Sequence, residues 1–156
     1  MSALLDDIRS EAEQRVAVVA EARTWLGTPW VHQAAIKGQA VDCAMFLISV
    51  FLRAGVISPF DPRPYPRSWF VHQHEERFLN SIVNHFKCQE VQPADARPGD
   101  ILMYRIGHCY AHGAILIAPA LVMHSFAKNG QVIYTETFDP DLASRSPRAF
   151  NPWGGR

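Results

Sequence analysis

One stretch constrains the fold more than any other: the twelve residues from Cys43 to Ala54 are apolar on nearly every side. The segment reads Cys-Ala-Met-Phe-Leu-Ile-Ser-Val-Phe-Leu-Arg-Ala, and its length favours a helix over a buried strand. A helix that is apolar all round has to be buried. Asp42 is a suitable N-cap before it, and Gly55 is a suitable C-cap after it. We therefore predict a buried helix over residues 43–54.

The segments around this helix contain further helical signals. Apolar residues recur at three- and four-residue steps over residues 5–26, which predicts an amphipathic helix that ends at Gly27. Its predicted apolar face consists of Ile8, Ala12, Val16, Val19, Ala22 and Leu26. Residues 58–68 are rich in proline and predict a loop, and residues 75–86 predict a short helix.

The second half of the chain predicts an antiparallel sheet. Four apolar stretches separated by turn signals cover residues 101–106, 111–117, 121–126 and 132–138. Asn129-Gly130, between the last two, is the strongest hairpin signal in the chain. The tail from Asp139 is expected to wrap the surface. Helices followed by strands predict an α+β fold, with residues 1–156 forming a single domain.

Composition and charge narrow the function classes. The 156 residues are 48% apolar and 19% charged, which indicates a folded domain rather than disorder. Fifteen basic and fifteen acidic residues cancel, so charge gives no argument for nucleic acid or an anionic membrane as partner. Three cysteines without a two-residue spacing predict neither a disulfide scaffold nor a zinc ribbon. With no signal peptide or membrane span evident, we expect synthesis in the cytoplasm and another export route for any extracellular work.

Cys43 is the first candidate for chemistry. At the first turn of a helix, unpaired N–H groups and the positive end of the helix dipole stabilise a thiolate, which is the nucleophilic form. The backbone N–H of Cys43 would also point toward an oxyanion that forms on an attacked carbonyl. The competing interpretation is a small core residue, the role of most free cysteines.

Two histidines on successive predicted strands strengthen the catalytic interpretation. His112 and His124 are twelve residues apart. A hairpin that turns at residue 118 places them directly opposite, and one that turns at Pro119 makes them diagonal neighbours on one face. A turn centred between two residues would separate them onto opposite faces. With Cys43 they fit a nucleophile, a base and a residue that orients the base: His112 would hold the thiolate as an ion pair and later protonate the leaving amine, and His124 would fix its tautomer.

A metal site is a weaker alternative. His108 and Cys109 precede His112, and Cys43 and His124 could complete a ligand set. No carboxylate that could support such ligands is evident nearby in the sequence. We therefore predict no metal and no cofactor.

Several short motifs in this order resemble the NlpC-type family of cell-wall cysteine peptidases. They are Trp25-Leu26-Gly27-Thr28-Pro29-Trp30, the run from Gly38 to Val41-Asp42-Cys43, Arg97-Pro98-Gly99-Asp100, Ala111-His112-Gly113-Ala114-Ile115 and Val122-Met123-His124-Ser125. The segment Pro64–Trp69 resembles the phage or phage-like branch. The resemblance covers residues 20–138 and implies a papain-like fold, with a catalytic cysteine helix packed on an antiparallel sheet. It also implies cleavage of peptide stems in peptidoglycan, typically next to D-glutamate.

The resemblance also implies roles for individual residues. It makes Cys43, His112 and His124 catalytic, and it places Trp30, His32 and Asp42 in substrate binding. The chain departs from the family pattern at two places. Ala44-Met45 stands where Ser-Gly usually follows the cysteine, and Trp30 stands where a tyrosine is common. In the family, the hydroxyl of that tyrosine helps to bind the substrate or the oxyanion. Our hypothesis is that Trp30 lines the site and that His32 or Gln33 supplies the polar contact that the tyrosine hydroxyl would make.

The sequence thus predicts a cysteine endopeptidase or amidase that cleaves peptidoglycan stem peptides, acting as part of a phage tail or phage-like particle. Its expected partners are the stem peptide and the proteins of that particle. Two other hypotheses stay open: a structural tail-assembly protein with vestigial catalytic residues, and a Cys–His amide or acyl hydrolase with another substrate.

Overall fold

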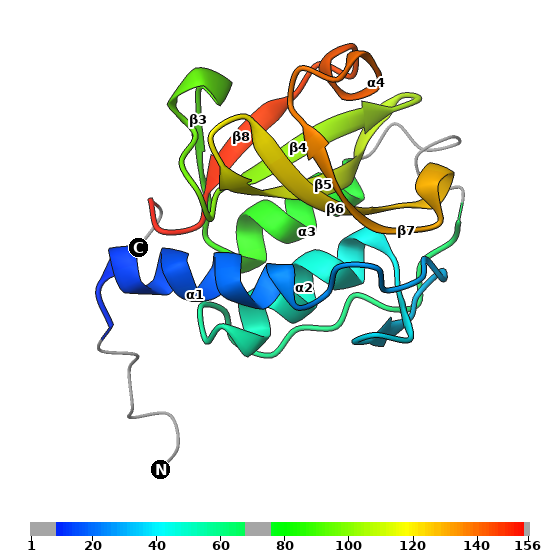
Figure 1. Ribbon diagram of the computed structural model, residues 1–156, viewed down its shortest axis with the longest axis horizontal. Coiled ribbons are helices and arrows are strands. Elements are labelled where there is room, and N and C mark those ends of the chain that lie inside the picture. Colours follow the sequence, from blue (N-terminus) through cyan, green and yellow to red (C-terminus); the bar gives the residue numbers. More distant parts are fainter. Residues whose placement is uncertain (1–8, 68–75, 155–156) are drawn as a thin grey trace.

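A six-stranded antiparallel sheet forms the centre of the protein, with the three longer helices packed on one face (Figure 1). The structure is a computed structural model and describes residues 9–67 and 76–154. The helices are α1 Glu11–Arg23, α2 Cys43–Arg53, α3 Arg77–His85 and α4 Pro140–Ala143. The strands are β1 Ala35–Ile36, β2 Ala40–Val41, β3 Gln89–Val91, β4 Ile101–Ile106, β5 Cys109–Ala118, β6 Leu121–Phe126, β7 Gln131–Glu136 and β8 Arg148–Asn151. The order in the large sheet is β3-β8-β4-β5-β6-β7, and β1 pairs with β2 separately.

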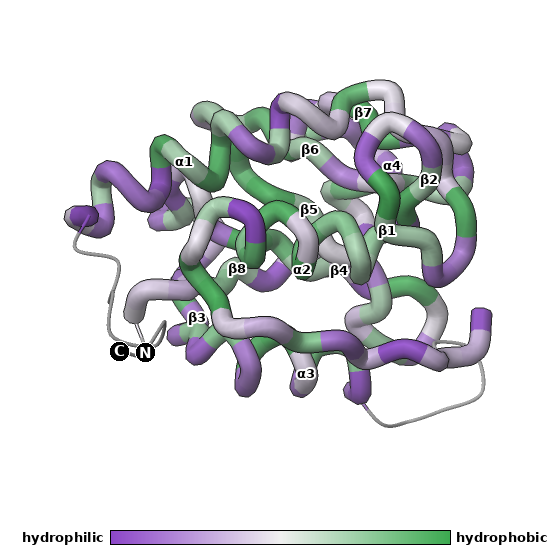
Figure 2. The backbone as a smooth tube through the Cα atoms, turned by 90° about the horizontal axis from the view of Figure 1, so that it is seen from below, coloured by the Kyte–Doolittle hydropathy of each residue, from purple (hydrophilic) through white to green (hydrophobic). Residues whose placement is uncertain are grey.

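Helix α2 confirms the buried helix that the sequence predicts. The Asp42 side chain accepts a hydrogen bond from the backbone N–H of Met45 at 2.9 Å and caps the first turn. Gly55 adopts a left-handed φ of 76° just after the helix, and the N–H of Val56 donates to the carbonyl of Phe51. These contacts form a Schellman motif, which satisfies the last carbonyls. Figure 2 shows α2 and β5 among the most hydrophobic parts of the backbone. Along α3, at the periphery, hydrophobic and hydrophilic residues alternate.

Close packing of α2 on β5 fixes where Cys43 lies. A Cβ atom at Gly113 of β5 would lie 2.5 Å from Cδ1 of Leu47 on α2. A side chain at position 113 would require the buried Leu47 side chain to move, and the Met103 sulfur lies 3.1 Å from the same position, so glycine favours the observed approach. The N-terminus of α2 is therefore held against the segment of β5 that carries His112.

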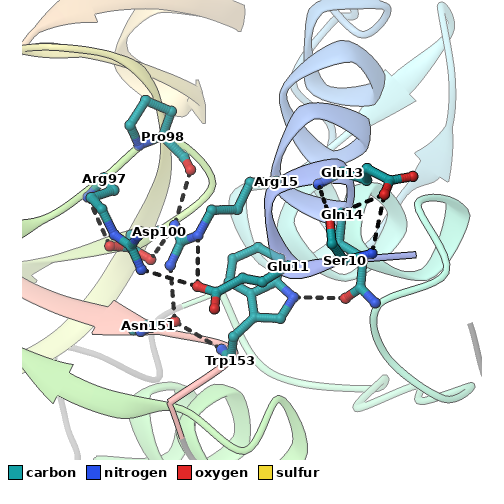
Figure 3. A network of polar contacts seen from close by, with 10 residues as sticks. All are labelled: Ser10, Glu11, Glu13, Gln14, Arg15, Arg97, Pro98, Asp100, Asn151 and Trp153. Carbon is teal, nitrogen blue, oxygen red and sulfur yellow. Dashed lines mark hydrogen bonds and ion pairs between the residues drawn. The ribbon is translucent and has the colours of Figure 1, made fainter. Parts of the chain in front are cut away.

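The buried face of helix α1 differs from the predicted apolar face. Its buried side chains are Gln14, Arg15, Val18 and Ala22, whereas Val16 is 70% exposed and Leu26 is 50% exposed. The reason is a polar network below the helix (Figure 3). Arg15 donates to Asp100 at 2.8 Å, and Gln14 accepts from the indole of Trp153 at 2.7 Å. These contacts turn the helix so that most of the predicted stripe faces outward; residues 5–8 lie outside the described part.

The predicted meander is confirmed, but the prediction for the tail is wrong. Strands β4 and β6 have the predicted bounds, and β5 and β7 differ by one or two residues at their ends. The chain after Asp139 does not wrap the surface. It forms α4 and then β8, which inserts between β3 and β4 and buries Ala149 and Phe150. The predicted helix at 75–86 is α3, whose expected first residue lies outside the described part.

The sheet separates two hydrophobic clusters. The larger cluster contains most of α2 together with Trp25, Phe86 and Ile115, and the smaller contains Tyr104, Leu116 and the Leu142 side chain of α4. Thus α4 covers the sheet face opposite the three longer helices (Figure 1). No helix among the described residues is long and apolar enough to cross a membrane.

Candidate active site

Cys43 opens into a cavity of about 290 Å³ at the N-terminus of α2. The cavity is lined by Trp30, His32, Asp42, Cys43, Ala44, Tyr65, Arg67, Ile106, Ala111, His112, Ser125, Phe126 and Ala127. Every residue that the sequence assigned to the site lines this cavity, except His124, which lies behind His112. The structure therefore brings the predicted nucleophile and base to one space.

The Cys43 sulfur rests against the backbone on both sides of His112. Its thiol donates to the carbonyl of Ala111 at 3.7 Å, and the N–H of Gly113 points toward the sulfur. Desolvation and the nearby Asp42 carboxylate raise the pKa of the Cys43 thiol to about 12. The backbone N–H groups of Gly113, Ala44 and Cys43 lower this pKa, as expected at a helix start, but burial outweighs them. The net shift therefore favours the thiol form of Cys43.

His112 and His124 form a direct hydrogen bond. Nε2 of His112 lies 2.7 Å from Nδ1 of His124, and both rings are buried. Strands β5 and β6 pair Leu116 with Val122, which centres the hairpin on residue 119. The histidines are therefore diagonal neighbours on one face, the second of the arrangements that the sequence allows.

Both histidines are neutral in this environment. Desolvation lowers the pKa of His112 well below its usual value, and the neighbouring His124 and Arg145 add to that effect. Desolvation also lowers the pKa of His124 to about 4, although Asp139 and Asp141 act in the opposite direction. Together with the Cys43 thiol, these directions describe a neutral pair. This differs from the thiolate–imidazolium pair that we expected from the helix dipole.

Thr135 adds a fourth side chain to the row of Cys43, His112 and His124, which is called the line below. Nε2 of His124 lies 2.9 Å from Oγ1 of Thr135 on β7. Sequence reasoning missed Thr135, although a signal was present. Val122 of β6 pairs with Thr135 of β7, so Thr135 is a diagonal neighbour of His124 across the predicted hairpin.

Asp42 organises the wall of the cavity. One carboxylate oxygen accepts from Met45, and the other accepts from the backbone N–H of Gln33 at 2.7 Å and from the Tyr65 hydroxyl at 2.5 Å. The Asp42 carboxylate also lies 3.9 Å from Nδ1 of His32. These protein contacts occupy both oxygens of Asp42. Its predicted role in substrate binding stays a prediction.

Tyr65 lines the cavity although it was not among the site residues predicted from the sequence. It comes from the proline-rich loop and is buried, and its carbonyl lies 3.0 Å from Nε2 of His32. Burial and the Asp42 carboxylate raise the pKa of Tyr65, so its hydroxyl stays protonated and donates. A tyrosine hydroxyl therefore reaches the cavity from this loop, while position 30 holds tryptophan.

Gln33 and His32 lie differently with respect to the cavity, and the polar contact to substrate that we expect from one of them stays a prediction. Gln33 does not line the cavity; its side-chain oxygen accepts from the N–H of Tyr65, and its carbonyl accepts from Arg63. His32 does line it, beside Trp30. The Arg67 guanidinium lies 5.7 Å from the centre of the Trp30 ring. The cavity thus has an aromatic wall with a cation over it.

The metal alternative finds no support in the part of the chain that the structure describes. No group of three or more His, Cys, Asp or Glu side chains there is arranged to hold a metal ion. Cys109 is buried at the start of β5, and desolvation raises the pKa of its thiol.

A cysteine at the start of a buried helix, against two histidines on an antiparallel sheet, defines the papain-like class of folds. The chain belongs to the NlpC/P60 family, whose model matches residues 27–146. Members of this family are generally cysteine peptidases that hydrolyse peptidoglycan. The curated proteins contain no match to this sequence.

Solved structures share this fold at low sequence identity. The NlpC/p60 domain of the peptidoglycan hydrolase SagA is 19% identical with a TM-score of 0.58, over 88% of this chain and 97% of that one. The peptidoglycan hydrolase RipB from Mycobacterium tuberculosis is 18% identical with a TM-score of 0.62, over 92% and 68%. RipD from the same organism is 15% identical with a TM-score of 0.56, over 88% and 96%, and is described as a non-catalytic domain adapted to binding peptidoglycan. Family membership alone therefore does not establish catalysis.

Proposed function

We propose that this protein is a cysteine peptidase that cleaves an amide bond in the peptide stems of bacterial peptidoglycan. One observation carries the proposal: the Cys43 sulfur lies against the backbone on both sides of His112, whose ring is hydrogen-bonded to His124. A nucleophile, a base and a residue that orients the base are the parts that acyl transfer to a thiol needs.

The first half of the reaction forms a thioester. His112 takes the Cys43 proton while the sulfur attacks the carbonyl carbon of the scissile bond, and the negative charge moves to the carbonyl oxygen. The backbone N–H groups at the start of α2 stabilise that oxyanion. The imidazolium of His112 then gives its proton to the leaving nitrogen, and the C–N bond breaks.

The second half restores the enzyme. His112 removes a proton from water, the resulting hydroxide attacks the thioester carbon, and the Cys43 sulfur leaves with the proton returned by His112. A thiol with a pKa of about 12 transfers its proton unfavourably to a buried imidazole. Proton transfer is therefore coupled to attack on the substrate, whose oxygen receives the charge.

The cavity lining supports an acidic peptide as substrate. Arg67 lines the cavity, and its only partner among the described residues is the Trp30 ring. A guanidinium suits a carboxylate, and the family resemblance implies cleavage next to D-glutamate. We propose that the substrate carries this carboxylate near the scissile bond.

We also propose that the protein acts as part of a phage tail or phage-like particle. The support is the resemblance of Pro64–Trp69 to that branch of the family; the last two residues lie outside the described part, but Tyr65 is built into the cavity wall. Docking on a particle would hold the enzyme near the wall and raise its effective concentration there.

A binding or assembly role is the second candidate, and the high pKa of the Cys43 thiol favours it, since an inert cysteine is a thiol at neutral pH. The two functions differ in what they do to purified peptidoglycan. A binding domain would sediment with it and leave its covalent structure intact.

Digestion of purified peptidoglycan tests the proposal. The protein and a Cys43→Ala variant are incubated with it, and released fragments are identified by mass spectrometry. New amine ends from the wild type alone are the expected result. Sedimentation of both proteins with peptidoglycan, with no fragments from either, would overturn the proposal in favour of binding.

A further inference from the structure

We propose that Thr135 is a positioning residue that sets the tautomers of both histidines by accepting a hydrogen bond from His124. The inference rests on the proposed function, because it concerns how His112 becomes a base. Thr135 lies on β7, outside the trio of Cys43, His112 and His124, and contacts the line at its far end.

The hydrogen bonds of this line permit only two arrangements of protons. A neutral imidazole has one N–H donor and one acceptor nitrogen, so each bond in the line fixes the next. If Nε2–H of His124 donates to Thr135, Nδ1 of His124 must accept from Nε2–H of His112. Nδ1 of His112 is then left with a free lone pair.

The reverse arrangement blocks catalysis. If the Thr135 hydroxyl donates to His124, then His124 carries its proton on Nδ1 and donates to His112. His112 then carries its proton on Nδ1 and has no free lone pair for the Cys43 proton. If His112 were nevertheless protonated, two N–H groups would face each other across 2.7 Å. Only Thr135 as acceptor leaves a working base.

The charges around Thr135 favour the productive arrangement. Thr135, His124, Asp139 and Asp141 line a second cavity of about 160 Å³ on the far side of His124 from His112. Asp139 and Asp141 both act to favour a proton on His124. Nε2 is the nitrogen of His124 that faces Thr135, which lines this cavity. The negative charge there therefore favours the tautomer of His124 with its proton on Nε2.

The two cations near this cavity offset only one of the two carboxylates. Lys128 pairs with Asp141 at 2.9 Å, and Arg145 pairs with the other oxygen of the same carboxylate at 2.9 Å. Both cations are thus directed at Asp141 and neither forms an ion pair with Asp139 among the described residues. Asp139, whose Oδ1 accepts from the backbone N–H of Asp141 at 3.0 Å, therefore keeps a negative charge at this cavity that no ion pair among the described residues offsets.

Two substitutions separate the hydrogen bond from packing. Thr135→Val has nearly the same shape but removes the hydroxyl, and Thr135→Ser keeps the hydroxyl with one methyl less. The tautomers are read from the ring-nitrogen shifts of ¹⁵N-labelled histidine in two-bond ¹H–¹⁵N spectra. Assignments come from His112→Gln and His124→Gln variants, and kcat and KM are measured on soluble stem peptides.

We expect both histidines of the wild type and of Thr135→Ser to be in the Nε2–H form. In Thr135→Val the Nε2–H population of His124 should fall, and kcat should drop by about 10- to 100-fold with KM unchanged. An Nδ1–H form of His124 in the wild type overturns the inference, and so does a Thr135→Val variant with unchanged tautomers and unchanged kcat.

The spectra keep this inference separate from the proposed function. They need no substrate, so a wild type that cleaves nothing but shows Nε2–H on both rings retains the inference and contradicts only the function. A wild type that cleaves peptidoglycan through Nδ1–H histidines contradicts the inference alone. If Thr135→Val does not fold, the wild-type spectrum still decides between the two arrangements.

Discussion

The cluster around Arg15 and the row Cys43, His112, His124 and Thr135 both have buried polar side chains at their centre, but the central groups are charged in the first and neutral in the second. Arg15 and Asp100 are charged, and further contacts to Glu11, Pro98 and Asn151 engage all three nitrogens of the guanidinium (Figure 3). Cys43, His112 and His124 are neutral, because burial shifts their pKa values away from the charged forms. The first cluster joins α1 to the turn before β4 and to the end of β8.

The difference teaches what each cluster can do. A buried ion pair whose partners are all engaged holds elements in place, and loss of one partner leaves a charge buried alone. A neutral line costs little to bury and can accept charge when a substrate supplies an electrophile. We therefore expect substitutions in the first cluster to change stability, and those in the second to change turnover.

The largest expected effect is on turnover, from His112→Ala. Removal of the base should lower kcat by on the order of 10⁴-fold or more, because the Cys43 thiol then has no proton acceptor. The free energy of unfolding should change by a smaller fraction of its wild-type value than kcat does. Peptide hydrolysis and thermal unfolding of the same preparations measure both, with His85→Ala as a control, since His85 lies on α3 away from Cys43. Residual kcat near the wild type would remove His112 from its proposed role.

Breaking the Arg15–Asp100 pair should destabilise the fold. Asp100→Asn is expected to lower the free energy of unfolding by about 3 kcal/mol, because it removes the buried carboxylate partner of Arg15 and leaves only the half-exposed Glu11 as counter-charge. The kcat of the folded fraction should stay at the wild-type value. Urea denaturation measures the first quantity. A double variant, Arg15→Met with Asp100→Leu, should recover part of the loss, and no recovery would contradict the desolvation argument.

The neutral histidines predict instability in acid. The pKa of His124 is lowered in the folded state to about 4, so the unfolded chain takes up a proton first as pH falls below about 6.5. Stability is then fully present above pH 6.5 and is lost between pH 6.5 and 4, by about 3 kcal/mol from this group. Urea midpoints across that range measure the loss. His124→Gln should flatten the curve, and an unchanged slope in that variant would assign the loss to other groups.

The smallest expected effect is on specificity. Arg67→Gln should lower kcat/KM about two- to fivefold for a stem peptide with a free carboxylate on D-glutamate, since Arg67 is exposed and its ion pair with substrate is screened. The same peptide with that carboxylate amidated should be cleaved equally by both proteins. An equal loss on both peptides would assign Arg67 to packing on Trp30 instead.

Local signals in the sequence were enough to predict α2, four of the strands and the histidine pair. An apolar run with Asp42 before it and Gly55 after it favours a buried helix. Successive side chains of a strand point to opposite faces, so the position of a turn decides which residues of the two strands share a face. The family resemblance added the papain-like fold, which is confirmed, and the substrate-binding roles of Trp30, His32 and Asp42, which stay predictions.

The features that the sequence did not predict depend on contacts between distant segments. Strand β8 is four residues long, and it is a strand because β3 and β4 bind both of its edges. The buried face of α1 is decided by Asp100 and Trp153, which lie far along the chain. Tyr65 reaches Asp42 across a loop with no periodic pattern, so only the folded chain reveals that contact.

Covalent trapping tests most directly whether Cys43, neutral until substrate arrives, is the nucleophile. The protein is mixed with a soluble stem peptide, quenched in acid within milliseconds, and its mass is measured before and after proteolytic mapping. We expect an added mass equal to the acyl half of the peptide, on Cys43 and on neither Cys88 nor Cys109. Turnover of the peptide by Cys43→Ala at the wild-type rate, or an adduct on another cysteine, would contradict it.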